Sequence, residues 1–106
     1  MTIAEVSRAY DISADTLRYY ERVGLLPSIG RTSGGIRNYS EEDCRWVEYI
    51  KCMRSAGVSV ETLVEYVALF YQGNETIQAR KNLLLEQREQ IAARIEELQA
   101  VLARLD

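Results

Sequence analysis

Residues 16–27 of this chain, TLRYYERVGLLP, restrict the fold more than any other segment. At helical spacing, Leu17 and Tyr20 fall on one face, and a cationic, hydroxyl-bearing face forms opposite them. Such a helix packs its apolar face on its own domain and offers guanidinium groups and hydroxyls to the phosphates and base edges of a duplex. We therefore predict a DNA-recognition helix, and the side chains that we expect to contact DNA are Thr16, Arg18, Tyr19 and Arg22.

Local signals mark the limits of this helix and predict a second helix before it. Ser13 is a suitable N-cap, and Gly24 with Pro27 ends the helical pattern. Upstream, Thr2 can cap a first short helix, and residues 10–12 can form the turn between the two. These features predict a helix-turn-helix in which the apolar stripe of the first helix consists of Ile3, Val6 and Ala9.

Residues 28–39 have the composition of a tight β-hairpin, with glycines at positions 30, 34 and 35. Residues 36–39 would form its second strand. Alternation along that strand puts Arg37 and Tyr39 on one face and Ile36 on the other. The alternative is an ordinary surface hairpin whose arginines are only solvated.

A second helix pair is predicted next. Ser40, followed by three acidic residues, is a strong N-cap for a helix that runs to about Ser55, and Gly57 ends it. Ser59 caps the following helix, whose apolar residues cover more than one stripe, so we expect it to be buried on more than one side. The buried stripe expected for the first helix of the pair consists of Trp46, Val47, Ile50 and Met53.

The last thirty or so residues have the apolar repeat of a coiled coil. After Gly73 and a possible cap at Asn74, the repeat predicts a rod of roughly 45 Å, longer than a small domain can cover, so the helix needs a partner. In a parallel pair the cations Lys81 and Arg88 would face their own copies, and this favours an antiparallel homodimer. The alternative is a helix that folds back on its own domain. The repeat consists of Ile77, Leu84, Ile91, Leu98 and Leu105, with Ile95 and Leu102 between them.

The motif TLRYYERVGLLP and the later RNY resemble the MerR family of winged-helix transcription regulators, and the resemblance extends from Ile3 to the last residue. It implies a mainly α fold: a winged helix-turn-helix DNA-binding domain with a second helix pair over residues 1–72, and a long antiparallel coiled-coil dimerisation helix over residues 74–106. It makes the hairpin the wing, in which Arg37 and Tyr39 touch the phosphate backbone and Arg31 lies close by.

The same resemblance implies a mechanism and partners. The homodimer would bind double-stranded promoter DNA at a pseudo-palindromic operator, and bend and untwist a spacer that is too long between the two promoter elements. RNA polymerase is a further expected partner, by family analogy.

The chain has two cysteines, Cys44 and Cys52, on one predicted helix. Eight residues separate them by about 12 Å along the helix, so they cannot form a disulfide within a subunit. Lys51 and Arg54 favour a thiolate at Cys52, whereas its place near the C-terminal end of the helix opposes one. The chemistry of the residues alone leaves open whether Cys52 is a sensor or a small core residue.

The run from Ile50 to Gly57 resembles the NmlR/AdhR branch of the family, thiol-based regulators associated with aldehyde and nitrosative stress. On that resemblance Cys52 is the effector-sensing residue, and Cys44 is structural. A regulator of the same type without a thiol-sensing role is the alternative. No metal site is predicted, because the chain has no histidine and no cysteine after position 52. A multidrug sensor of the family would need a ligand domain after the coiled coil, and the sequence stops at Asp106, so we do not expect this class of sensor.

The net charge of −3 argues against nucleic acid only until its distribution is considered. Residues 16–40 contain four arginines and one carboxylate, that of Glu21, so this segment is basic. The acidic residues are concentrated elsewhere, among them residues 41–43. A dimer can therefore present two basic segments to a duplex although the whole chain is acidic.

Composition also argues against other classes of protein. There is no histidine, no phosphate-binding glycine loop and no cluster of acids around a nucleophile, so we predict neither an enzyme nor a cofactor. No stretch approaches the ~20 apolar residues of a membrane span, and the N-terminus lacks the layout of a signal peptide, so we expect a cytoplasmic protein. The remaining alternative is a coiled-coil interaction adaptor that does not bind DNA.

Overall fold

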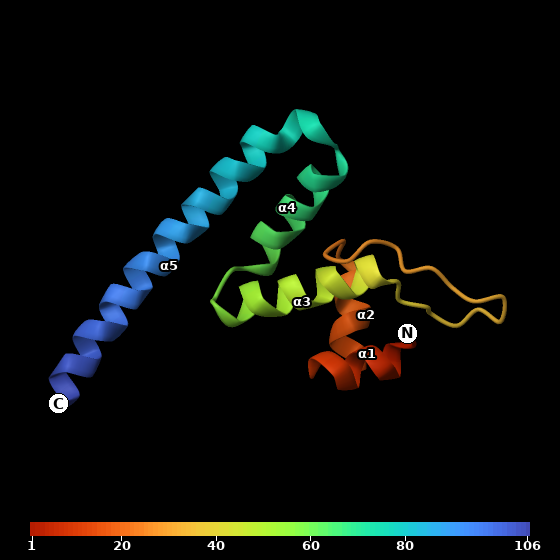
Figure 1. Cartoon of the computed structure of the whole chain (residues 1–106), viewed down its shortest axis with the longest axis horizontal. Helices are drawn as coiled ribbons and strands as arrows, with labels where there is room; N and C mark the ends of the chain where they lie inside the picture. The colour runs from red at the N-terminus through yellow and green to blue at the C-terminus, as the bar shows by residue number, and fades with distance from the viewer. The chain divides into compact units, whose positions relative to one another are not determined.

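The computed structural model describes all 106 residues and contains two compact units, Met1–Ala68 and Leu69–Asp106. Figure 1 shows a helical chain with one long hairpin loop between the second and third helices. This confirms the predicted mainly helical class, with a helix-turn-helix and a long C-terminal helix. The domain limits 1–72 and 74–106 stay a prediction. The elements are α1 (Ile3–Tyr10), α2 (Ala14–Arg22), α3 (Glu41–Ser55), α4 (Val60–Tyr71), the short 3₁₀ helix η1 (Asn74–Thr76) and α5 (Ile77–Leu105).

The helix-turn-helix begins at the predicted caps. The Thr2 side chain accepts a hydrogen bond from the backbone N–H of Glu5, whose carboxylate accepts one from Thr2 in return. Ser13 caps α2 through its hydroxyl, which accepts a hydrogen bond from the backbone N–H of Thr16 at 3.1 Å. Ala9 was predicted to be buried and is exposed, because steps of three residues rotate by about −60° each and turn this position roughly 120° away from the start of the stripe.

Caps and apolar side chains also define α3. Ser40 and Asp43 form a reciprocal capping box, and the helix ends at Ser55 as predicted. Gly57, at φ 93°, provides the left-handed conformation that reverses the chain after the helix. The core of the first unit is built around six side chains that are essentially inaccessible to solvent: Val6, Leu17, Leu25, Leu26, Val47 and Ile50.

Burial of α4 is narrower than predicted. Within the chain only Leu63 and Val67 are buried on this helix, whereas Ala68 and Phe70 are exposed. The sequence assigned the second covered side of α4 to the end of a long helix of a partner, so that expectation stays a prediction for the dimer. Tyr66 packs on Tyr49 and Trp46 of α3, whereas Ala68, Phe70 and Tyr71 stay exposed.

The hairpin of residues 28–39 forms a turn but not a β-ladder. An antiparallel bridge joins Arg31 to Arg37, and the backbone N–H of Asn38 donates to the carbonyl of Gly30 at 2.7 Å. The predicted second strand is therefore wrong, because two short segments without a third strand or a packing surface form only a marginal ladder. We call residues 28–39 the wing.

The second unit begins around a buried threonine. Thr76 is the N-terminal cap residue of α5, and its hydroxyl donates to the carbonyl oxygen of Leu69 at 2.6 Å, with the carbonyl of Gly73 at 2.9 Å. Asn74, the predicted cap, instead begins η1 and is wrong as the cap of the long helix. α5 then continues for 29 residues without a buried side chain. No helix of the chain has the length and apolar character required to cross a bilayer.

Candidate nucleic-acid interface and candidate thiol site

The predicted recognition helix has the two faces expected from the sequence. Leu17 is fully buried and Tyr20 is half-buried, whereas Arg18, Tyr19 and Arg22 are exposed. Thr16 is half-buried, and its hydroxyl accepts a hydrogen bond from that of Ser13 at 2.8 Å. The predicted division of α2 into a buried and an exposed face is therefore confirmed. The contacts of these side chains with DNA stay a prediction.

The exposed cations of α2 are held by their neighbours. The Arg18 guanidinium lies 2.9 Å from the carboxylate of Asp15, in a pair whose side chains are 46% and 96% exposed. The guanidinium carbon of Arg22 lies 5.5 Å from the centre of the Tyr19 ring, a cation–π contact. Both contacts lie at the surface, so a phosphate can replace them at small energetic cost.

The wing is linked to α2 through Arg37. Its Nε atom donates to the Oε1 atom of Glu21 at 2.9 Å, and the two side chains are only 24% and 20% exposed. Arg31, across the bridge from Arg37, donates from Nη1 to the carbonyl oxygen of Gly35 at 2.9 Å. The structure therefore links Arg37 to the recognition helix, whereas the hydrogen bond of Arg31 stays within the wing.

Tyr39 shares a side of the wing with Arg37, as alternation predicted, while Ile36 points to solvent at 59% exposure. That shared side, however, faces the protein. Tyr39 is only 2% exposed, and its hydroxyl is buried without a hydrogen-bond partner. Burial, followed by the negative charge of Glu21, raises the pKa of this hydroxyl above its usual value. A phosphate contact from Tyr39 is not available in this conformation and stays a prediction.

The two thiols occupy different environments. Cys52 is exposed on α3, one turn after Tyr49, whereas Cys44 is buried at 8% exposure. The Lys51 ammonium beside Cys52 donates to the carbonyl oxygen of Tyr10, and the Arg54 guanidinium donates to that of Val58. Both cations lie within two residues of Cys52 in the sequence, and both side chains are hydrogen-bonded to backbone carbonyl oxygens.

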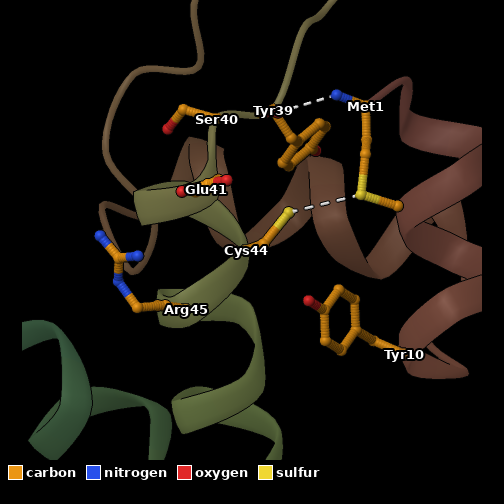
Figure 2. A pocket seen from close by; sticks show the side chains of 7 residues that line it. All are labelled: Met1, Tyr10, Tyr39, Ser40, Glu41, Cys44 and Arg45. Atoms are coloured by element: carbon orange, nitrogen blue, oxygen red, sulfur yellow. Dashed lines mark hydrogen bonds between the residues drawn. The ribbon is translucent and has the colours of Figure 1, made fainter.

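Cys44 faces a surface pocket of about 390 Å³. Its Sγ atom lies 3.8 Å from the Sδ atom of Met1, and Figure 2 shows the Tyr10 ring of α1 facing the same pocket. Burial, then the neighbouring Cys44, raises the pKa of the Tyr10 hydroxyl. In this structure no three side chains of histidine, cysteine, aspartate or glutamate converge in a way that could hold a metal ion.

An aromatic cluster next to Cys52 was not predicted. Tyr49 of α3 stacks on Tyr66 of α4, with ring centres 5.8 Å apart, and Trp46 meets both rings edge-on at 6.0 and 6.3 Å. Burial, followed by the nearby Tyr66 and Cys52, raises the pKa of the Tyr49 hydroxyl. The three-residue spacing from Trp46 to Tyr49 and from Tyr49 to Cys52 was the available signal for part of this cluster.

Two family descriptions match the chain and overlap within it. Residues 1–69 match the family described as MerR HTH family regulatory protein, and residues 44–106 match the family described as MerR, DNA binding. Together they cover the full sequence.

Individual proteins and structures are also similar. The HTH-type transcriptional regulator AdhR of Bacillus subtilis is 53% identical over 91 residues, which are 86% of this chain and 65% of AdhR, so the match spans just under two thirds of that relative. A protein of Listeria monocytogenes, solved as a candidate MerR family transcriptional regulator, has a TM-score of 0.96 at 46% identity and is covered to 80%, while all of this chain is covered. HiNmlR, a MerR family regulator lacking the sensor domain and solved with promoter DNA, has a TM-score of 0.91 at 32% identity; 98% of this chain and 82% of that chain are covered.

Proposed function

Since the chain belongs to the MerR family of helix-turn-helix regulatory proteins, we propose that it binds its operator as an antiparallel homodimer and responds to electrophiles through Cys52. The protein is a DNA-binding transcriptional regulator of the MerR type. The residues that contact DNA, the form of the dimer and the effector are proposed in addition to this family role.

The proposed DNA-binding surface combines α2 with the wing. The exposed cations of α2 and the salt bridge that joins Arg37 to α2 support this assignment, because they bring arginines of two segments together on adjoining elements. The surface contacts of Arg18 and Arg22 are weak enough to be exchanged for phosphates. The residues assigned to this surface are Thr16, Arg18, Tyr19, Arg22, Arg31, Arg37 and Tyr39.

The proposed dimer forms through α5, which would give the chain a DNA-binding part at residues 1–72 and a dimerisation part at residues 74–106. Its support is the unusual exposure of apolar side chains along one helix, since isolated apolar side chains gain free energy from burial against a partner. Lys81 and Arg88 within the seam favour the antiparallel arrangement. The exposed side chains are Ile77, Leu84, Leu85, Ile95, Leu98, Val101, Leu102 and Leu105.

Two DNA-binding units on one rigid dimer fit a pseudo-palindromic operator. We propose that the dimer distorts the promoter spacer and that RNA polymerase then engages the distorted promoter. The relative HiNmlR was solved on promoter DNA, which supports binding of this architecture to a promoter duplex. Sequence-dependent deformation of DNA supplies the energy difference between the inactive and the active promoter shape.

The proposed effector site is Cys52. The observation that supports it most directly is the exposure of Cys52 next to the burial of Cys44, because an electrophile must reach the sulfur that it modifies. The 53% identity to AdhR supports the same branch of the family. With an aldehyde, the Cys52 sulfur would add to the carbonyl carbon, the carbon–oxygen π bond would break, and the thiol proton would end on the oxygen. No oxidant is required for this step.

The experiment that tests DNA binding starts by selecting duplexes from a random pool with the full 106-residue chain. Affinity for the recovered duplex is then measured by fluorescence anisotropy over a range of salt concentrations. A pseudo-palindromic consensus, and an affinity that falls steeply with salt, are expected. Failure to recover any consensus, or binding that is insensitive to salt, would overturn the proposal and favour a protein-binding adaptor.

A further inference from the structure

We propose that Glu21 is a positioning residue for DNA binding: its carboxylate holds the Arg37 side chain, and with it the wing, against the recognition helix. This inference rests on the proposed function, in which Arg37 contacts the DNA backbone. Glu21 is the sole carboxylate among residues 16–40, and charge alone would make it unfavourable on a surface that meets phosphates. A positional role explains what a carboxylate does there.

The geometry of the pair differs from that of an ordinary surface ion pair. The Nε atom of Arg37 and the Oε1 atom of Glu21 are 2.9 Å apart, and about a quarter or less of either side chain is exposed. The Arg18–Asp15 pair has the same distance but exposures of 46% and 96%. Partial burial weakens screening by solvent and salt, so the Glu21–Arg37 pair is the one that can hold a fixed geometry.

The buried side chains of Ile29 and Tyr39 anchor the two ends of the wing, but the part between them has few means of staying in place. Inside the hairpin there are only one β-bridge and a few backbone hydrogen bonds, and the sequence carries Gly34 and Gly35 at its tip. At its base, Tyr39 exchanges backbone hydrogen bonds with Met1. Between tip and base, the Arg37 side chain supplies a direct link to α2, sixteen residues away in sequence.

The burial of Tyr39 explains why the Arg37 side chain points toward the protein. Because side chains two residues apart lie on the same side of an extended segment, the buried Tyr39 ring turns Arg37 toward the protein as well. The Nε atom of Arg37 faces Glu21, which leaves the two terminal nitrogens of a planar guanidinium for a phosphate. Glu21 can therefore orient Arg37 without being displaced by the DNA.

Electrostatics and positioning predict opposite signs for the loss of Glu21. If its charge matters only by repelling phosphates, removing it tightens DNA binding. If it positions Arg37, removing it weakens binding, because the free Arg37 side chain and the wing must then be ordered at the moment of association. The sign of the change therefore decides between the two roles.

The experiment is a double-mutant cycle on the selected duplex with Glu21→Ala, Arg37→Ala and the combined variant. We expect Glu21→Ala to weaken binding by roughly tenfold, and to have no further effect once Arg37 is alanine. Glu21→Gln keeps an oxygen acceptor and should fall between the wild type and Glu21→Ala. Each variant is present twice in a dimer, so losing the Arg37 contact should reduce the salt slope by roughly two.

Asp15→Ala is the matched control, because it removes a carboxylate from the same helix but breaks an exposed pair. It should leave affinity unchanged or increase it. Thermal unfolding of every variant sets a temperature at which all are folded, and Glu21→Gln preserves the test if the alanine variant unfolds.

The outcomes separate the inference from the proposed function. If Arg37→Ala leaves affinity unchanged, the proposed DNA surface is wrong. If Arg37→Ala weakens binding but Glu21→Ala tightens it, or if the two losses simply add, the surface stands and the positioning role of Glu21 is overturned.

Discussion

The rings of Tyr49 on α3 and Tyr66 on α4 stack with their centres 5.8 Å apart and their planes inclined by 28°. Trp46, the single tryptophan of the chain, contacts both rings edge-on. Cys52 follows Tyr49 by three residues, which places both on neighbouring turns of α3. A group added to Cys52 would therefore lie close to the aromatic cluster that contains Trp46, the intrinsic fluorophore of the chain.

We predict that modification of Cys52 changes the emission of Trp46. An adduct on Cys52 crowds Tyr49, and a shift of the Tyr49 ring alters the edge-on contact that Trp46 makes with it. Steady-state emission is recorded during titration with formaldehyde or methylglyoxal. The control is Cys44→Ser, which should respond like the wild type. An equal response from Cys52→Ser would show that the signal arises elsewhere.

The second prediction concerns the relative reactivity of the two thiols. Cys52 should form an adduct with N-ethylmaleimide well before Cys44, because Cys52 is exposed, whereas the Cys44 side chain is 8% exposed and can be approached only through the pocket that it lines. Intact mass spectrometry over time counts the adducts, and peptide mapping assigns them. Cys52→Ser should lose the fast phase alone.

The same variant tests regulation. A promoter fused to a reporter and controlled by this protein should lose its response to aldehydes in Cys52→Ser while the protein still binds the operator. A full response in Cys52→Ser would remove Cys52 from the mechanism and leave a regulator of the same type without a thiol switch.

Sequence signals located the helices but not all contacts between them. Ser13 and Ser40 mark helix starts because a cap involves residues only three positions apart. The Glu21–Arg37 pair joins residues sixteen positions apart, so no local pattern contains it. Tyr39 illustrates the same limit: alternation gave its side of the wing correctly, but only the packing against the first unit determines that this side faces inward.

The predicted N-cap of the long helix, Asn74, was wrong for a related reason. Asn74 is a good cap by composition, yet the buried hydroxyl of Thr76 binds the carbonyl oxygen of Leu69 in the last turn of α4 and that of Gly73 in the following turn. The turn between α4 and α5 is closed by these hydrogen bonds, and they require a hydroxyl at position 76, two residues after Asn74. Local preference is therefore overridden by the hydrogen bonds of the turn as a whole.

We predict that Tyr39→Phe leaves the free energy of unfolding unchanged or raises it by up to about 1 kcal/mol. The hydroxyl is buried without a partner, so its removal abolishes a desolvation cost and breaks no hydrogen bond. Chemical denaturation of both proteins at neutral pH measures the difference. A loss of more than about 1 kcal/mol would mean that the hydroxyl has a partner after all.

The pH dependence of this variant follows from the raised pKa of Tyr39. The folded protein holds the phenolic proton more tightly than the unfolded chain, so the wild type loses stability as the pH rises above about 10. Tyr39→Phe should lose less over the same range. If Tyr39→Phe also weakens operator binding at neutral pH, the hydroxyl becomes accessible to a phosphate on the DNA; unchanged affinity would remove Tyr39 from the contact set.

The final prediction concerns the seam of α5, where Leu98 is 58% exposed in the single chain. Leu98→Lys replaces an exposed apolar side chain with a charge, which is harmless in a monomer but places a desolvated ammonium in an antiparallel pair. We expect sedimentation velocity at micromolar concentration to show a dimer for the wild type and a shift toward monomer for Leu98→Lys, with operator affinity reduced in parallel. Gln90→Lys adds the same charge outside the seam and should remain dimeric. A wild-type chain that stays monomeric at every concentration, or a Leu98→Lys variant that dimerises as well as Gln90→Lys, would show that this seam does not join two subunits.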